Sequence, residues 1–110
     1  MGGYDFNYNL VSVQETHPSD TILKHCATLR DVASGHGLVV YTDQPGVQLY
    51  TGNFLDGSYV GKDGVPIEKH AGVCLETQAW PNAINNPVAA DHVILRPGQK
   101  YSHKTVWALS

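Results

Sequence analysis

Hydrophobic and polar residues alternate in short runs along this chain, and glycine or proline separates the runs. Glycine and proline together number 17 (11 plus 6), and the segments between them are rich in β-branched and aromatic residues. Residues 23–33 alternate strictly, with Leu23, His25, Ala27, Leu29 and Asp31 on one face. The pattern predicts a strand there, a hairpin loop at 34–37 and a second strand at 38–42.

The rest of the chain continues this pattern of short strands and turns. Pro45 and Gly46 form a turn, and further strands are expected at the following ranges: 47–51, 72–78, 93–95 and 101–109. Residues 80–90 are expected to be irregular, because Pro81 and Pro87 cannot donate to the ladder of a central strand. Strands this short and evenly spaced favour an antiparallel sandwich or barrel.

Composition and charge exclude several classes of function. With 110 residues and 42% hydrophobic content, the chain fits one globular domain. Its net charge of -3 and only seven Lys and Arg argue against a nucleic-acid partner. No apolar run approaches the ~20 residues that span a membrane, and the N-terminus does not look like a signal peptide. We therefore expect no membrane partner and a cytoplasmic location.

Cysteine and histidine spacing gives no support for a metal site. Cys26 and Cys74 lie far apart and form no CxxC or zinc-ligand pattern, so the sequence predicts free, buried thiols in a reducing compartment. The six histidines are dispersed without an HExxH or H-x3-5-H pattern. His70 is expected to be a solvated loop residue, and His103 a hydrogen-bonded residue of the last strand.

Glu76 is the strongest candidate for chemistry. It interrupts an apolar, β-prone run just before Trp80 and Pro81, and ionised carboxylates are costly to bury unless they are paired. It therefore suits a general base whose neighbours tune its proton affinity. The alternative is a rim carboxylate paired with Lys69 or with another cation across the sheet.

Two further residues are candidates for binding a sugar. Asp5 lies between Tyr4 and Phe6, and aromatic rings stack on sugar faces while carboxylates accept hydrogen bonds from sugar hydroxyls. Its alternative role is to cap a turn. Gln48 lies on the same side of its strand as Gly46 and can both donate and accept hydrogen bonds; its alternative is an ordinary exposed strand position.

Three long blocks resemble the aldose 1-epimerase (galactose mutarotase) family. They are YTDQPGVQLYTGNFLDG at 41–57, KHAGVCLETQAWPNA at 69–83 and LRPGQKYSHKT at 95–105. The blocks are in family order and the resemblance runs from Gly3 to the end of the chain. It corresponds to about the last third of a full-length member, so the resemblance implies that residues 1–110 are the C-terminal part of such a domain.

The resemblance implies a fold, a reaction and residue roles. Members fold as a large antiparallel β-sandwich and interconvert the α and β anomers of hexoses such as galactose and glucose, without a cofactor. Glu76 matches the general base that removes the proton of the C1 hydroxyl group. Asp5 and Gln48 match residues that bind the substrate. We therefore expect an all-β, antiparallel β-sandwich with a hexose as its small-molecule partner.

The resemblance also implies what this chain lacks. The family's general acid is a histidine in the N-terminal part, and none of the six histidines here occupies a matching motif. Phe6 stands where members usually have histidine. We therefore expect weak or no mutarotation from this chain alone. Two alternatives are a non-catalytic carbohydrate-binding module and, last, a sugar-phosphate epimerase, which would need a basic phosphate clamp.

Overall fold

The computed structural model describes residues 2–110, which form two antiparallel β-sheets joined by loops and three short 3-10 turns. The three-stranded sheet has the order β1–β5–β6, and the four-stranded sheet has the order β2–β3–β4–β7. The strands are β1 (Asp5–Asn9), β2 (Thr16–His17), β3 (Asp20–Arg30), β4 (Gly37–Thr42), β5 (Gly46–Tyr50), β6 (Cys74–Gln78) and β7 (Thr105–Leu109).

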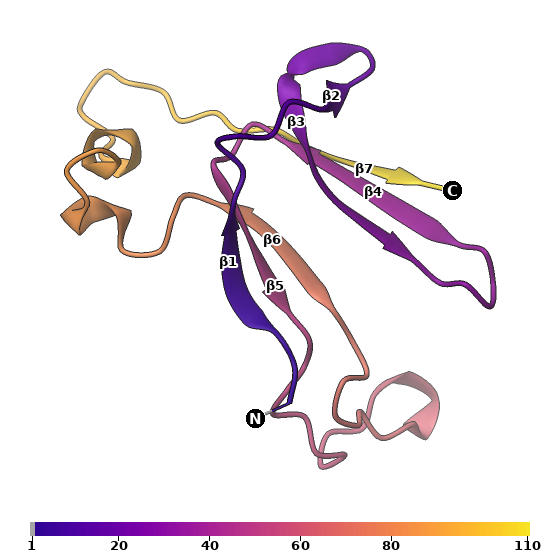
Figure 1. Cartoon of the computed structure of the whole chain (residues 1–110). Helices are drawn as coiled ribbons and strands as arrows, with labels where there is room; N and C mark the ends of the chain where they lie inside the picture. Colours follow the sequence, from indigo (N-terminus) through magenta and orange to yellow (C-terminus); the bar gives the residue numbers. More distant parts are fainter. Residues whose placement is uncertain (1) are drawn as a thin grey trace.

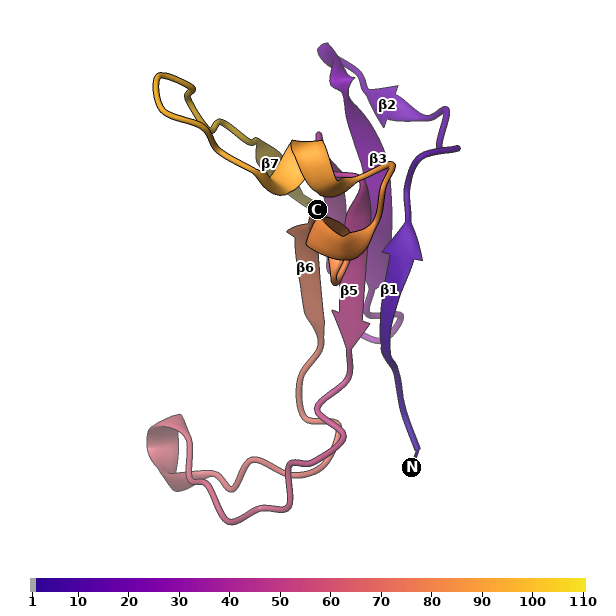
Figure 2. The same ribbon diagram turned by 90° about the vertical axis from the view of Figure 1, so that its left-hand side faces the viewer.

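The two sheets lie in separate layers of a sandwich (Figures 1 and 2). They are joined where β4 ends and β5 begins, and from that corner they diverge toward their far ends (Figure 1). The segment between β5 and β6 extends away from both sheets and contains a 3-10 turn at Lys62–Gly64 (Figure 2). The all-β, antiparallel sandwich predicted from the sequence is confirmed.

Several predicted strands are confirmed with small shifts at their ends, namely β3, β4, β5 and β6. The strand predicted at 93–95 is wrong, because Ala90–Val93 forms a 3-10 turn. The side chain and carbonyl oxygen of Asn86 accept hydrogen bonds from the backbone N–H groups that lead into this turn. The last strand begins only at Thr105, since the backbone N–H of Lys104 donates to the Asp43 carboxylate and not to a neighbouring strand. The short strand β2 and the strand β1 were not predicted.

A β-bulge at Cys26 changes the predicted face pattern of β3. His25 pairs with Tyr41, but Ala27 pairs with Val40, so Cys26 is an extra residue in the ladder. Directly paired residues share a face and neighbours on β4 alternate, so His25 and Ala27 point to opposite faces. The single face predicted for residues 23–31 is therefore wrong. Cys26 is half-buried, and this burial raises the pKa of its thiol to about 11.

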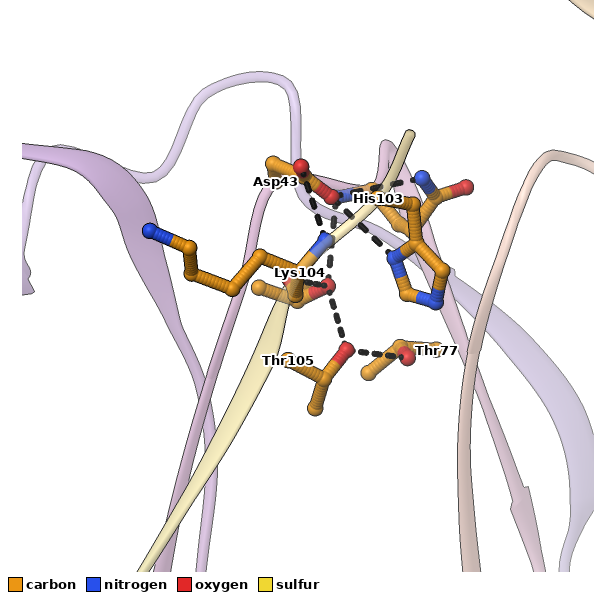
Figure 3. A network of polar contacts seen from close by, with 7 residues as sticks. Asp43, Thr77, His103, Lys104 and Thr105 are labelled. Atoms are coloured by element: carbon orange, nitrogen blue, oxygen red, sulfur yellow. Dashed lines mark hydrogen bonds and ion pairs between the residues drawn. The ribbon is translucent and has the colours of Figure 1, made fainter. Parts of the chain in front are cut away.

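Hydroxyl groups link the two sheets near their common corner (Figure 3). The Thr105 hydroxyl of β7 lies 2.8 Å from the Thr77 hydroxyl of β6 and 3.1 Å from the Thr42 hydroxyl of β4. Asp43 accepts hydrogen bonds from the Lys104 backbone N–H at 3.0 Å and from His103 Nδ1 at 3.2 Å. The hydrogen bond predicted for His103 is confirmed, but its predicted place in the last strand is wrong, because β7 begins at Thr105. This network sets the corner from which the sheets diverge.

Candidate functional site

One face of the three-stranded sheet carries all three residues predicted to form the site. In the ladder, Gln48 of the central strand β5 pairs with Asn7 of β1 on one side and with Glu76 of β6 on the other. Asp5 lies two residues before Asn7 and so points to the same face. The sequence places these residues 71 positions apart (76 minus 5), and the antiparallel pairing brings them onto one surface.

A chain of amide and carboxylate hydrogen bonds orients the side chains of this polar face. Gln48 Nε2 donates to Asp5 Oδ1 at 2.8 Å. Gln78 Nε2 lies 3.1 Å from Asn7 Oδ1 and 3.4 Å from Gln48 Oε1, and it donates to both. These bonds hold the Gln48 amide between its two neighbours. Asp5 Oδ2 and the second Gln48 N–H remain available to a ligand.

Glu76 lies in the middle of β6 with its side chain exposed. Four ion pairs occur among residues 2–110, and Glu76 takes part in none of them. The pairing with Lys69 that was its alternative role is therefore not seen in the described part of the chain. A carboxylate with free oxygens, on the same face as a fixed amide and a second carboxylate, is able to accept a proton from a hydroxyl group bound beside it.

An aromatic side chain borders the polar face where β5 begins. Trp80 donates from Nε1 to the carbonyl oxygen of Pro45 at 3.1 Å. Its ring passes so close to Gly46 that an added Cβ there would lie 3.2 Å from Trp80 Cδ1 and 2.7 Å from Asn7 Oδ1. Gly46 therefore allows the indole ring and the Asn7 amide to approach the same point of the sheet.

Sequence reasoning placed Tyr50 on the side of Gln48 but missed three side chains of this face beside the predicted site residues. They are Asn7, Cys74 and Gln78. The signal was present, because each lies two residues from a predicted site residue and a strand repeats its faces every two residues. Cys74 is exposed on this face, so its predicted burial is wrong, although both cysteines are free as expected.

His70 lies near one end of the sheet, in a loop. Its Nδ1 donates to the carbonyl oxygen of Thr51 at 2.8 Å, and its backbone adopts a left-handed conformation with φ of 64°. The side chain is exposed, as predicted for a loop histidine. Its hydrogen bond to the backbone gives it a structural role in closing the loop.

A large cavity lies away from the three predicted site residues. It has a volume of about 1100 Å³, between residues 79–102 and the corner of the two sheets, and its lining includes Trp80, His92 and Tyr101. Of the polar face it includes Gln78 but none of Asp5, Gln48 and Glu76. The site that the three residues form is therefore an open sheet surface.

A metal centre and a membrane-spanning helix find no counterpart in the part of the chain that the structure describes. Among residues 2–110, no three His, Cys, Asp or Glu side chains are grouped so that they could hold a metal ion. Within the same residues, no helix is long and apolar enough to cross a membrane.

Comparisons with known proteins agree with the resemblance of the motifs. The family model described as aldose 1-epimerase matches residues 1–108. Human galactose mutarotase is 48% identical over 110 residues, covering 100% of this chain and 30% of the human protein. Mouse galactose mutarotase is 48% identical over 108 residues, covering 98% of this chain and 29% of its own length.

A more distant relative and the matched lengths complete the comparison. The bifunctional protein gal10 of Schizosaccharomyces pombe is 38% identical over 72 residues, which are 66% of this chain and 9% of that protein. This chain spans about 30% of the length of the mammalian relatives that it matches. The matched span includes the polar face and both sheets. The chain belongs to the aldose 1-epimerase family.

Proposed function

We propose that the polar face of the three-stranded sheet binds a hexose and that Glu76 is the base of an anomer interconversion. The observation that carries this proposal is the placement of Asp5, Gln48 and Glu76 on one face, on three adjacent strands. The proposal is also supported by relatives whose names identify them as galactose mutarotases. A hexose presents several hydroxyl groups, which suit a surface of amides and carboxylates.

In this proposal, the reaction opens and closes the sugar ring. Glu76 takes the proton of the C1 hydroxyl group, and the electron pair of that O–H bond forms the carbonyl group at C1. The C1–O5 bond breaks, and its electron pair leaves with O5, which an acid protonates. Rotation about the C1–C2 bond presents the other face of the aldehyde, and the reverse steps close the ring as the other anomer.

Asp5 and Gln48 would position the sugar for this proton transfer. The bond between Gln48 Nε2 and Asp5 Oδ1 fixes both groups before a ligand arrives. A ligand then gains their hydrogen bonds without the full entropic cost of ordering them. Gln78 and Asn7 support the same amide from its other side.

In the described part of the chain, the polar face holds no histidine that could serve as the acid. Among residues 2–110, its titratable groups are two carboxylates, the Tyr50 phenol and the Cys74 thiol, and none is a histidine or another cation. Loss of one member of an acid–base pair costs ~10²–10⁴-fold in rate. We therefore expect this chain alone to bind hexoses and to interconvert them slowly. This open face also favours a second candidate function, a non-catalytic hexose-binding surface.

Polarimetry and fluorescence separate these functions. We expect crystalline α-galactose to mutarotate slightly faster with the chain than without it, and Glu76→Gln to remove this increase. Glu68→Gln is the matched control, because Glu68 is exposed on the segment between β5 and β6. Trp80 emission in a Trp107→Phe background reports binding at the polar face.

Each outcome has a distinct meaning. A saturable change in Trp80 emission that is lost in Asp5→Asn and Gln48→Leu, without a rate that depends on Glu76, supports hexose binding alone. No saturable binding, or binding that these substitutions leave unchanged, overturns the proposed site. A rate unaffected by Glu76→Gln overturns its role as the base.

A further inference from the structure

The inner faces of the two sheets carry apolar residues that are exposed on the edge strands β1 and β7 and at the end of β3. In the three-stranded sheet, Phe6 and Tyr8 alternate with the polar face and remain 60% and 45% exposed. In the four-stranded sheet, Leu29, Trp107 and Leu109 share the face of Val40 and are 41%, 63% and 83% exposed. We call these five residues the open inner surface.

These residues point toward the space between the layers, as the linked hydroxyls show. Thr77 shares the face of Val47, and its hydroxyl bonds to that of Thr105, which shares the face of Trp107. Near this link the sandwich is closed, since Val40 and Val47 are only 0% and 4% exposed. The same two faces that form the core on β4 and β5 are therefore open to water on the edge strands β1 and β7 and at the end of β3.

The amount of exposed surface is unusual for a chain of this size. Its accessible surface is 8079 Å², whereas a compact monomer of its mass has about 6,000 Å². Its radius of gyration is 16.8 Å, compared with about 13 Å for a compact domain of this length. This excess of about 2,000 Å² includes the open inner surface and the segment between β5 and β6 that extends from the sheets. It is larger than the roughly 800 Å² that one partner contributes to a standard interface.

The strand edges point to a β-rich occupant. Among the described residues, β1 and β6 are the edges of one sheet, and β2 and β7 are the edges of the other. Unpaired edges bind further strands, because their N–H and C=O groups lack partners. An occupant that offers both apolar side chains and strands would cover the open inner surface and continue the sheets.

We propose that the open inner surface binds a polypeptide equivalent to the part of galactose mutarotase that this chain does not match. The human relative is 48% identical over the full 110 residues, but those residues are only 30% of its length. In that relative, the matched span and the remaining 70% belong to one chain. A second copy of this chain would offer the same apolar residues but no sequence from that remainder.

Co-expression tests the proposal without any sugar or catalytic readout. This chain, carrying an affinity tag, is produced with the part of human galactose mutarotase that it does not match. We expect the two to co-purify as an equimolar complex and Trp107 emission to shift to shorter wavelength as its indole ring leaves water. Absence of co-purification overturns the proposal, and so does a complex that contains only two copies of this chain.

Substitutions locate the interface. Trp107→Asp should weaken the complex at least about tenfold, because a buried unpaired carboxylate is costly. Val32→Asp is the matched control, since Val32 is 91% exposed in the loop between β3 and β4 and lies outside the open inner surface. Leu109→Asp, at the end of β7, is a second variant whose fold is checked by circular dichroism. Equal affinities for the Trp107, Leu109 and Val32 variants overturn the assigned surface.

The docking proposal rests on family membership and surface exposure, so its failure is distinguishable from failure of the proposed function. Glu76→Gln lies on the opposite face of the sheet and should leave complex formation unchanged within twofold. If complex formation persists but mutarotation by the complex does not depend on Glu76, the function is wrong and the docking surface stands. If hexose binding is seen without complex formation, the docking surface is wrong and the proposed binding site stands.

Discussion

The hydrogen bond between Gln48 and Asp5 can be tested by reversing its chemistry. Gln48→Glu replaces the amide donor with a carboxylate at a position where Gln48 Nε2 lies 2.8 Å from Asp5 Oδ1. The variant loses this hydrogen bond and gains a like-charge pair. Two like charges about 4 Å apart repel by about 1 kcal/mol in water and about 4 kcal/mol near a protein surface.

The exposure of Asp5 decides which end of this range applies. Because its side chain is in contact with water, screening favours the lower value. Adding about 1 kcal/mol for the lost hydrogen bond gives a destabilisation of about 2 kcal/mol at pH 7. This corresponds to a roughly 30-fold smaller folding equilibrium constant.

Urea unfolding followed by circular dichroism measures this change. At pH 7, the variant should have a lower unfolding midpoint than the wild type, and added salt should reduce the difference. In acid, protonation of the carboxyl groups removes the repulsion of about 1 kcal/mol, so the difference should fall to about half.

A second substitution distinguishes this specific contact from general damage. Asp5→Asn in the Gln48→Glu background restores one donor and one acceptor with their positions exchanged. We expect the double variant to recover most of the lost stability. Gln48→Leu, which removes the bond without adding charge, should not respond to Asp5→Asn in this way. An equal loss in the presence and absence of Asp5→Asn, or no dependence on pH, would refute the reasoning.

Three other predictions concern packing, buried hydroxyls and thiols. Gly46→Ala should destabilise the chain by about 1–3 kcal/mol in urea unfolding and alter indole emission, because its Cβ would lie 2.7 Å from Asn7 Oδ1; a neutral result would contradict it. Thr42→Val should cost about 1–3 kcal/mol by the same assay, since the hydroxyl bonds three partners in a fully buried position, and equal stability would show that the hydroxyl link is dispensable. Cys74 should react first with a thiol reagent at pH 8, whereas Cys26, with a pKa raised to about 11 by burial, should react quickly only as pH approaches that value; equal rates in the Cys74→Ser and Cys26→Ser variants would contradict this.

The sequence predicted most of the strands because their signals are local. Period-two alternation and the Gly and Pro residues between runs locate β3 to β6 within a few residues. The bulge at Cys26 could not be predicted, since it depends on which residue of β4 opposes it. The start of β7 was misplaced for a similar reason, because Lys104 bonds to the distant Asp43 carboxylate.

The residues of the candidate site were named from the sequence, but their arrangement was not. The family motifs identified Asp5, Gln48 and Glu76 one at a time. The register that brings them together joins strands far apart in the chain, and no local pattern specifies it. Asn7 and Gln78 were overlooked although alternation places them on the same face. Their role becomes visible only through the hydrogen bonds that hold the Gln48 amide.

The proposed site and the open inner surface are linked by the alternation of the strands. Each proposed site residue has a neighbour in sequence that points to the inner face, as in the pairs Asp5–Phe6, Gln48–Leu49 and Glu76–Leu75. A one-residue slip of β1 or β6 would exchange the two faces, so burial of the apolar neighbours also fixes the register of the polar ones. A polypeptide that covers the inner surface would therefore strengthen hexose binding on the opposite face even if it contributed no ligand of its own. Asp5 and Glu76 lie on edge strands, so their positions should gain most from that support.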